Sequence, residues 1–529
     1  MKKIFTSTLI ALSFVSIAFA QQRPQGGQNQ NGPRPTTTTT PAASAQVKEE
    51  VKTNSNIASR TIVPESAVIT NHTVTIRGKS VPYKATTGTL PVWDEDGKPI
   101  AGLFYTYYER SDIQNKDSRP LVISFNGGPG SASVWMHIAY TGPVVLNIDD
   151  EGYPIQPYGY KDNNTSILDI ADIVYIDPVN TGYSRITNKD VPTSKFFGVR
   201  ADIKYLAEWI NTFVTRNNRW ASPKFLIGES YGTTRVSGLA LELQSNQWMY
   251  LNGVILVSPT ELGIERGTVM DAALRLPYFA ATAWYHKMLP SDLQGKKLTD
   301  MLPEVEKFTV NELIPAIAKG GFLPIEEKQK IAARMARYSG IAEKVILQNN
   351  LDVSTNLFWK ELLRDKGFTV GRLDSRYKGI DRAAAGESPD YNAELTSWLH
   401  SFTPAINMYI RNELNYKTDL KYNMFGPVNP WDRTGDNSGE NLRAAMAQNP
   451  YLHVLVQSGY YDGACDYFNA KYNMWQMDPS GKLKDRMSWE GYESGHMMYL
   501  RKPDLKMGND HIREFIEKAL PKPGVPAKF

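Results

Sequence analysis

The chain has 529 residues, with 59 Lys and Arg against 55 Asp and Glu and a formal net charge of +4. This small charge argues against nucleic acid or an anionic membrane as a partner. Hydrophobic residues make up 41% of the chain, which is ordinary for a globular protein with a sizeable core. The length allows one large domain with an insertion, or two or three domains.

Residues 1–20 have the pattern of a secretory signal peptide. Lys2 and Lys3 form a positive end, a largely apolar stretch follows, and Ala18-Phe19-Ala20 fits a small-x-small cleavage site. An uncleaved membrane anchor is the alternative, but the apolar stretch is short and interrupted by Ser and Thr. We therefore expect a cleaved leader and a mature protein that is exported to a periplasm or secreted, with no membrane attachment.

Residues 21–59 begin with a low-complexity region rich in Gln, Gly, Asn, Pro and Thr, which predicts a disordered linker. Order is expected from about Arg60. Cys465 is the only cysteine, so no internal disulfide can form and stability must come from core burial.

Two kinds of strand pattern follow. Residues 67–109 alternate polar and apolar residues around the turn Asp96-Gly97, which predicts an antiparallel meander. Short apolar runs then alternate with helical patterns, including an amphipathic one at 201–214; the runs are 121–125, 173–176, 225–227 and 254–257. This alternation predicts an α/β protein with a mostly parallel central sheet and helices on both faces.

The strand signal disappears after Pro259, and residues 263–421 are expected to form a helical cap insertion. Its predicted helices cover 270–288, 325–337 and 391–412. Strand patterns return at 453–456 and 487–489, before a last amphipathic helix at 509–519. The core is thus expected in two parts, 60–262 and 422–529.

The stretch Gly228-x-Ser230-x-Gly232 follows the apolar run 225–227 and precedes a helical pattern at 233–243. This is the strand–turn–helix context of a nucleophile elbow, in which small residues permit a sharp turn and the serine hydroxyl is exposed. A short Gly/Ser pattern also arises by chance in ordinary loops, so the assignment depends on whether a base and an acid accompany it.

An elbow serine needs a base, and the base needs an acid to hold its tautomer. Of the seven histidines, His496 lies in a small flexible loop after the last strand pattern, where the order Ser–Asp–His places the base. His137 is a rival, and the other five occupy positions typical of structural histidines. Asp462 is the candidate acid, with Asp466 as the neighbouring alternative.

The glycine-rich turn Asn126-Gly127-Gly128-Pro129-Gly130 directly follows a predicted strand. Its backbone N–H groups can approach a substrate and stabilise an oxyanion. A phosphate-binding loop is the alternative, but neither G-K-[ST] nor G-x-G-x-x-G is present.

Together these motifs resemble the serine carboxypeptidases. The match adds 177–184 (Asp-Pro-Val-Asn-Thr-Gly-Tyr-Ser), Gly459-x-x-Asp462-x-x-Cys465 and Gly495-His496-Met497 to the turn and the elbow, in the same order. The resemblance implies an α/β-hydrolase fold with a cap and the removal of single residues from the C-terminus of peptides. Its spacing selects Asp462 over Asp466.

The resemblance also implies a role for each matching residue. Ser230 would be the nucleophile, His496 the general base and Asp462 the orienting acid. Other roles fall into two groups: oxyanion N–H donors, Gly128 and Tyr231, and binders of the substrate's terminal carboxylate, Asn126, Gly127 and Glu229. A glutamate beside that carboxylate must hold a proton, so we expect peptidase activity to favour acidic pH. The alternative for Glu229 is a solvated turn residue.

The chain departs from the family at two positions. Ser131-Ala132-Ser133 stands where Cys-Ser-Ser is usual, and Tyr140 stands where a second glutamate of the carboxylate site is expected. A phenol can donate a hydrogen bond, but the smaller acid network puts strict carboxypeptidase selectivity in question. Cys465 matches a free cysteine near the site in relatives; alternatively it is a small buried apolar residue.

Two other functions remain open on this scaffold. An esterase or acyltransferase uses the same triad, and a catalytically silent binding protein could keep the fold. The sequence shows no metal cluster and no cofactor motif, and it leaves open the preferred side chains, the oligomeric state and any activating cleavage.

Overall fold

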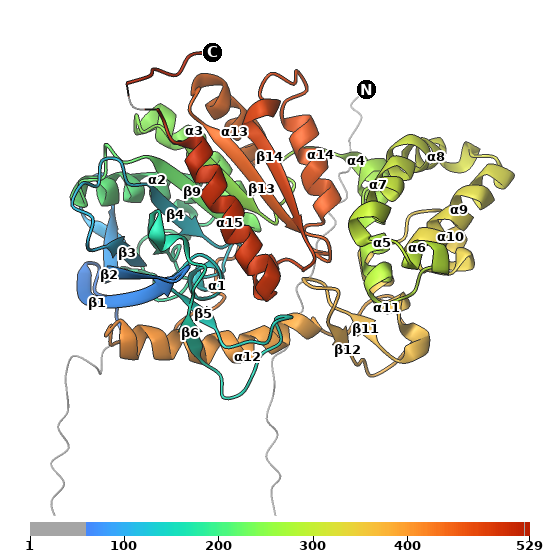
Figure 1. Ribbon diagram of the computed structural model, residues 1–529, viewed down its shortest axis with the longest axis horizontal. Helices are drawn as coiled ribbons and strands as arrows, with labels where there is room; N and C mark the ends of the chain where they lie inside the picture. The colour runs from blue at the N-terminus through green and yellow to red at the C-terminus, as the bar shows by residue number, and fades with distance from the viewer. Residues whose placement is uncertain (1–59, 523) are drawn as a thin grey trace, which may run out of the picture. The chain divides into compact units, whose positions relative to one another are not determined.

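A ten-stranded sheet runs through the protein (Figure 1). The computed structural model describes residues 60–522 and 524–529, so the expected leader at 1–20 and linker at 21–59 lie outside the described residues. The strands of the sheet are β1 (Ser66–Ile76), β2 (Lys79–Trp93), β3 (Pro99–Arg110), β4 (Leu121–Phe125), β7 (Asp172–Ile176), β8 (Arg185–Ile186), β9 (Lys224–Glu229), β10 (Gly253–Val257), β13 (His453–Gly459) and β14 (Met487–Tyr492).

The strand order is β1-β2-β3-β7-β4-β9-β10-β13-β14, with β8 paired to β3. The meander β1–β3 is antiparallel and joins β7 antiparallel, whereas every pair from β7 to β14 is parallel. This confirms the predicted mostly parallel α/β sheet. The carboxyl ends of β4, β9, β10 and β13 therefore meet at one edge, where ligands bind in open α/β sheets.

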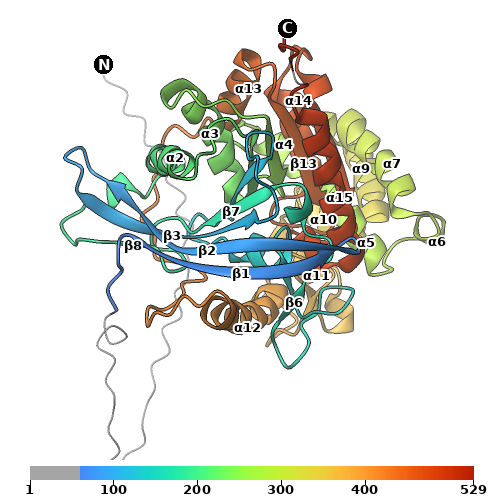
Figure 2. The same ribbon diagram turned by 60° about the vertical axis from the view of Figure 1, so that its left-hand side comes forward.

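The parallel strands are buried on both faces, which explains their continuous apolar runs. Successive residues enter opposite cores: Val122 and Ile227 pack on one face, whereas Ile123 and Leu226 pack on the other. The first core includes α1 (Val134–Ala139), α12 (Ala393–Met408) and α15 (Lys502–Ala519). The second includes α2 (Val199–Arg216), α3 (Tyr231–Asn246) and α13 (Ser438–Gln448). Figure 2 shows α2 and α3 on one side of the β1–β3 ribbon and α12 on the other.

The chain between β10 and β13 is mainly helical, and its first part, residues 273–370, forms a third hydrophobic core together with residues that follow β13. Before α12 its helices are α4 (Gly267–Ala273), α5 (Leu276–Tyr285), α6 (Ser291–Gln294), α7 (Leu298–Phe308), α8 (Ile314–Lys319), α9 (Ile325–Ser339), α10 (Glu343–Gln348) and α11 (Thr355–Glu361). In Figure 1 these helices gather beside α14 (Tyr467–Met477), at the side of the protein where β14 ends the sheet.

Some boundaries differ from the sequence-based expectation. The helix predicted over 270–288 is two helices, because Pro277 lies in the first turn of α5 and cannot continue α4. The helix predicted over 391–412 is α12 followed by a π-helical turn, Tyr409–Glu413. Five short strands were not anticipated because two or three residues leave no periodic pattern: β5 (Val144–Leu146), β6 (Tyr160–Asp162), β8, β11 (Thr369–Val370) and β12 (Lys378–Gly379). Within the described residues, no helix is long and apolar enough to cross a membrane.

Candidate active site

Ser230 lies at the sharp turn between β9 and α3. Its backbone has a φ of +58°, which residues with a side chain seldom adopt. A Cβ on Gly228 would lie 2.2 Å from the carbonyl oxygen of Gly232, so the turn cannot close around a larger residue there. The Ser230 N–H donates to Val257 O at 3.0 Å and ties the turn to the end of β10. The local geometry is that of a nucleophile elbow.

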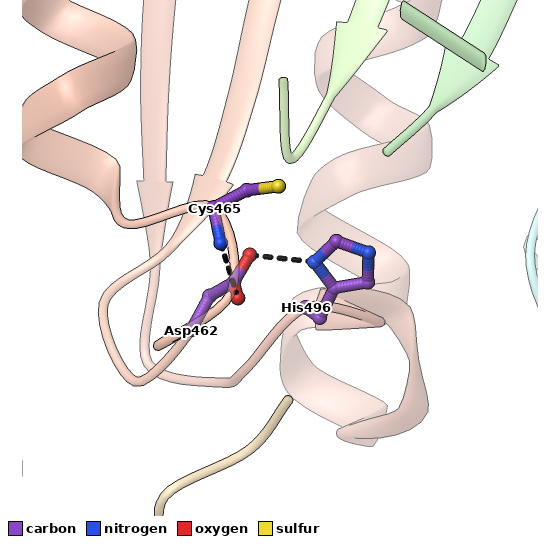
Figure 3. A group of neighbouring side chains, drawn as sticks. All are labelled: Asp462, Cys465 and His496. Carbon is purple, nitrogen blue, oxygen red and sulfur yellow. Dashed lines mark hydrogen bonds and ion pairs between the residues drawn. The ribbon is translucent and has the colours of Figure 1, made fainter. Parts of the chain in front are cut away.

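His496 and Asp462 form a buried hydrogen-bonded pair in the loops that follow β14 and β13 (Figure 3). His496 Nδ1 lies 2.7 Å from Asp462 Oδ2. The other oxygen of Asp462 accepts the backbone N–H groups of Ala464 and Cys465 at 2.8 and 3.0 Å. Burial lowers the pKa of His496, but the Asp462 carboxylate offsets this and the net pKa is raised. The pair can therefore hold an imidazolium, as a general base must.

The base loop and the elbow are joined through the end of β10. Ser230 N donates to Val257 O, and the next residue, Ser258, donates its hydroxyl to the backbone oxygen of His496 at 2.8 Å. Across the described residues, no hydrogen bond joins Ser230 Oγ to His496. Catalytic hydrogen bonds are often long in the absence of substrate, and the elbow and the His496 loop are both held by the end of β10.

The rival residues serve other purposes. His137 is buried under Tyr175 at a ring distance of 4.5 Å, lies 2.6 Å from the Tyr108 hydroxyl, and has its pKa lowered to about 3 by burial. Asp466 caps α14 by accepting the N–H of Asn469 at 3.0 Å. Neither forms a pair with His496.

The glycine turn after β4 packs directly on the elbow. A Cβ on Gly127 would lie 2.4 Å from the backbone nitrogen of Tyr231, which explains why only glycine fits. Gly128 is exposed with a φ of +103°. Tyr231 is the first residue of α3, where a helix leaves its N–H without an internal partner. Of the two residues expected to form an oxyanion hole, Tyr231 thus directly follows Ser230, and Gly128 directly follows the glycine that packs on Tyr231.

Glu229 is buried next to this turn. Only 2% of it is exposed, so the alternative of a solvated turn residue is excluded. Asn126 Nδ2 donates to Glu229 Oε1 at 3.0 Å, and the hydroxyl of Tyr499 donates to Glu229 Oε2. Burial raises the pKa of Glu229 to about 7, although His496 and the two hydrogen bonds oppose the shift. The carboxyl is therefore protonated at acidic pH.

The Tyr140 hydroxyl is not hydrogen-bonded to Glu229 in the described part of the chain. Its hydroxyl donates to Gln457 Oε1 at 2.7 Å, while its ring stacks on Tyr499 at 4.6 Å between centroids. Tyr140 stands where a second glutamate was expected, but the ring of Tyr499 lies against it. Tyr499, not Tyr140, makes the hydrogen bond to Glu229. Sequence reasoning missed Tyr499, because a tyrosine three residues after His496 has no pattern that distinguishes it.

Cys465 is partly exposed beside the acid–base pair (Figure 3). One side-chain atom each from Asp462, Cys465 and His496 lies within 4.8 Å of the others, which is close enough for a metal. Burial raises the pKa of the Cys465 thiol well above its usual value, and both oxygens of Asp462 already accept hydrogen bonds. The cluster is occupied in orienting His496, and we assign no metal to it.

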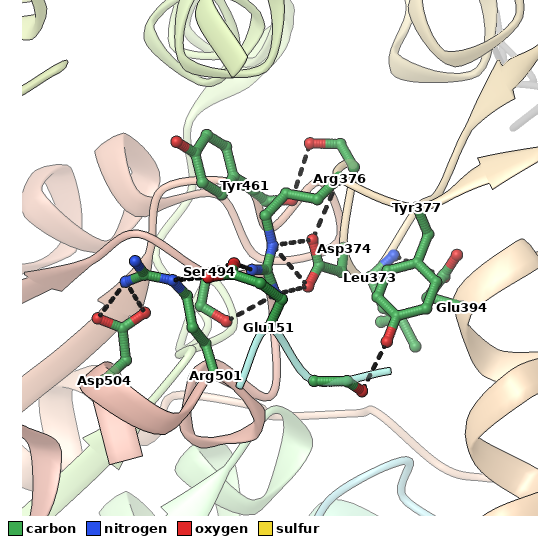
Figure 4. Close-up of polar contacts among 12 residues, drawn as sticks. Glu151, Leu373, Asp374, Arg376, Tyr377, Glu394, Tyr461, Ser494, Arg501 and Asp504 are labelled. Carbon is green, nitrogen blue, oxygen red and sulfur yellow. Dashed lines mark hydrogen bonds and ion pairs between the residues drawn. The ribbon is translucent and has the colours of Figure 1, made fainter. Parts of the chain in front are cut away.

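A segment of the helical insertion, residues 372–377, holds both the Asp462 loop and the His496 loop; we call it the strap (Figure 4). The N–H of Gly463 donates to Arg372 O at 3.0 Å, and the N–H of His496 donates to Leu373 O at 2.6 Å. Within the strap, buried Arg376 forms a two-pronged ion pair with Asp374 and donates to Ser494 Oγ at 3.2 Å. No pattern in the sequence indicates this contact.

Comparisons with known proteins agree with this geometry. The sequence model of a family described as "Serine carboxypeptidase" matches residues 76–503. "Serine carboxypeptidase-like 16" of Arabidopsis thaliana is 28% identical over 203 residues, 36% of this chain and 44% of the relative. "Retinoid-inducible serine carboxypeptidase" of Rattus norvegicus is 27% identical over 159 residues, 29% of this chain and 31% of the relative. The chain thus spans about half or less of the length of these curated relatives.

A solved structure shares the fold. Kex1(delta)p, a prohormone-processing carboxypeptidase from Saccharomyces cerevisiae, superposes with a TM-score of 0.50 at 15% identity, over 82% of this chain and 91% of that chain. The α/β-hydrolase prediction is confirmed at the level of the fold.

Proposed function

Because the chain belongs to the serine carboxypeptidase family, we propose that it is a serine-type carboxypeptidase that releases residues from the C-terminus of peptides. The observation that carries the proposal is the buried Glu229, which is hydrogen-bonded to Asn126 directly beside the elbow serine. A triad alone acts on many acyl donors, whereas a protonated carboxyl next to the nucleophile suits a substrate with a free carboxylate.

The proposed reaction proceeds through an acyl-enzyme. Ser230 Oγ attacks the last peptide carbonyl while His496 takes its proton, and Asp462 stabilises the imidazolium that forms. The backbone N–H groups of Gly128 and Tyr231 stabilise the oxyanion. His496 then protonates the leaving amine, and water releases the shortened peptide by the same steps in reverse order.

Binding of the terminal carboxylate is assigned to Asn126, Gly127 and Glu229. A deprotonated Glu229 would repel the substrate, since two nearby carboxylates cannot both ionise freely. The raised pKa of Glu229, about 7, supports peptidase activity that is favoured at acidic pH and declines as Glu229 loses its proton. Nothing in the proposed reaction requires a cofactor.

An esterase or acyltransferase is the second candidate, because the same serine, histidine and aspartate serve those reactions. Either of these activities leaves the buried carboxyl of Glu229, beside Ser230, without a role. We also propose that the protein is exported, which the basic, apolar and small-residue pattern of residues 1–20 supports. N-terminal sequencing of the mature protein should begin after Ala20, and an intact Met1 would contradict export by cleavage.

Mass spectrometry of a peptide incubated with the wild type and with Ser230→Ala, between pH 4 and 8, tests the activity. We expect stepwise loss of C-terminal residues with the wild type, most rapid at acidic pH, and none with the variant. The same peptide with a C-terminal amide should be cleaved far more slowly. Equal cleavage of acid and amide forms, with rapid hydrolysis of simple esters, would favour the esterase.

A further inference from the structure

Tyr499 is the residue that contacts Glu229 where a second acid was expected. Its hydroxyl donates to Glu229 Oε2, and the side chains of both residues are almost fully buried, with 1% and 2% exposed. The two residues lie 270 positions apart in the chain, so the contact exists only because the loop after His496 returns to the elbow. No other hydroxyl in the described part of the chain bonds to this carboxyl.

Two neighbours fix the geometry of this contact. Tyr140 stacks on the Tyr499 ring with an interplanar angle of 13°, and its own hydroxyl is committed to Gln457. On the other side of the carboxyl, Asn126 accepts the N–H of Met136 at 3.0 Å, which turns its amide nitrogen toward Glu229. Glu229 is therefore held from two sides, by an amide and by a phenol.

Counting hydrogens shows what this pair can bind. When Glu229 is protonated, the carboxyl and the phenol carry two hydrogens, of which their mutual bond uses one. The second hydrogen is available to a third acceptor. When Glu229 is ionised, the single remaining hydrogen is consumed by the mutual bond, and the pair carries a negative charge that repels an anion.

We propose that Tyr499 is a specificity-determining residue, which with Glu229 forms an acid–phenol pair that recognises the free carboxylate of a peptide only while Glu229 is protonated. This inference rests on the proposed carboxypeptidase function. An acid–phenol pair differs from a site with two carboxyls in how it titrates. Two carboxyls that share a proton titrate in coupled steps, whereas the phenol stays protonated and only Glu229 titrates.

The surroundings of Tyr499 and Glu229 favour a single titration step, the loss of the proton from Glu229. Burial raises the pKa of Tyr499 far above the neutral range, so it holds its hydrogen throughout. Burial also raises the pKa of Glu229 to about 7. The titratable and charged groups that act on Glu229 are His496, Asp462, Tyr499 and Tyr140.

Kinetics with matched variants and substrates test the role of Tyr499. Benzyloxycarbonyl-Phe-Leu has a free C-terminal carboxylate, whereas the leaving group of benzyloxycarbonyl-Phe ethyl ester has none. Tyr499→Phe should raise KM for the dipeptide about tenfold, because Glu229 then loses one of the two hydrogen bonds that hold its carboxyl in place. The same substitution should lower kcat/KM for the ester much less, because the ester has no terminal carboxylate to bind. Tyr140→Phe is the matched control. It keeps the ring that stacks on Tyr499 and removes only a hydroxyl that is bonded to Gln457, so it should alter neither value.

The outcomes separate this inference from the proposed function. If Glu229→Gln keeps the wild-type preference for the free acid, the carboxylate site itself is wrong. If Glu229→Gln loses that preference but Tyr499→Phe keeps it, or if Tyr499→Phe and Tyr140→Phe lose it equally, the role of Tyr499 is overturned.

A binding measurement provides a second test, which needs neither turnover nor a folded Tyr499→Phe variant. In His496→Gln the titration of the base is removed, and calorimetry can follow 3-phenylpropanoate binding between pH 5 and 9. Affinity should fall tenfold per pH unit above the pKa of Glu229, which corresponds to one proton. A hundredfold fall per pH unit would mean two coupled acids and would refute the acid–phenol pair.

Discussion

Replacing Arg376 with methionine should destabilise the fold and slow catalysis together. The side chains of Arg376 and Asp374 are each 2% exposed and joined by bonds of 2.7 and 3.0 Å, so removal of the guanidinium leaves a buried carboxylate unpaired. Breaking such a pair costs about 3–5 kcal/mol. The additional contact of Arg376 with Glu151 adds little, because Glu151 is half exposed.

The catalytic effect follows from what the strap holds. Leu373 O accepts the His496 N–H and Arg372 O accepts the Gly463 N–H, so a displaced strap moves both the base and the acid. A misplacement of about 1 Å can cost about 100-fold in rate. We therefore expect kcat of Arg376→Met to fall by up to about 100-fold, with a smaller change in KM because the carboxylate site lies on other segments.

Urea unfolding and steady-state kinetics, at a temperature where the variant is folded, measure the two effects. Arg443→Met is the control, because Arg443 pairs with Glu440 in an exposed ion pair worth less than about 1 kcal/mol. The double variant Asp374→Asn/Arg376→Met should recover part of the stability, since no charge is left buried. Equal losses in Arg376→Met and Arg443→Met, or no recovery in the double variant, would refute the reasoning.

Two further predictions concern groups whose pKa is raised by burial. Glu394 is fully buried, and burial raises its pKa from 4.5 to about 7. Between pH 4.5 and 7 the folded chain therefore keeps a proton that the unfolded chain releases. The free energy of unfolding should fall as the pH rises through this range. Glu394→Gln should remove a fall of at most about 3 kcal/mol from the pH dependence of urea unfolding; an unchanged slope would contradict this. The Cys465 thiol, whose pKa is raised by burial, should react with iodoacetamide at pH 7 far more slowly in the native protein than in urea, and equal rates would show a reactive thiol.

Much of the fold follows from local patterns. Continuous apolar runs such as 121–125 and 254–257 indicate strands buried on both faces, and the structure has β4 and β10 there. The glycines of the elbow and of the turn after β4 were expected from the need for close backbone approach, and the contacts a Cβ would make at Gly127 and Gly228 give the physical reason.

The site contacts that were missed depend on distant segments. Tyr499 and Glu229 lie 270 residues apart, and only the folded sheet brings them into contact. The strap belongs to the insertion, whose aromatic-rich helical patterns are typical of core packing and do not indicate a contact with the His496 loop. The direction of the Tyr140 hydroxyl is set by Gln457 on β13, which no spacing along the chain reveals. Such contacts become visible only with three-dimensional structure.

The strap makes the insertion inseparable from the chemistry. In many enzymes the segment that covers the sheet can be exchanged to alter which substrates enter, while the reacting groups stay untouched on the scaffold beneath. Here a wholesale exchange of the chain between β10 and β13 would also remove two backbone carbonyls on which the base and acid loops rest. Engineering of a new specificity must therefore keep residues 372–377 and graft only around them.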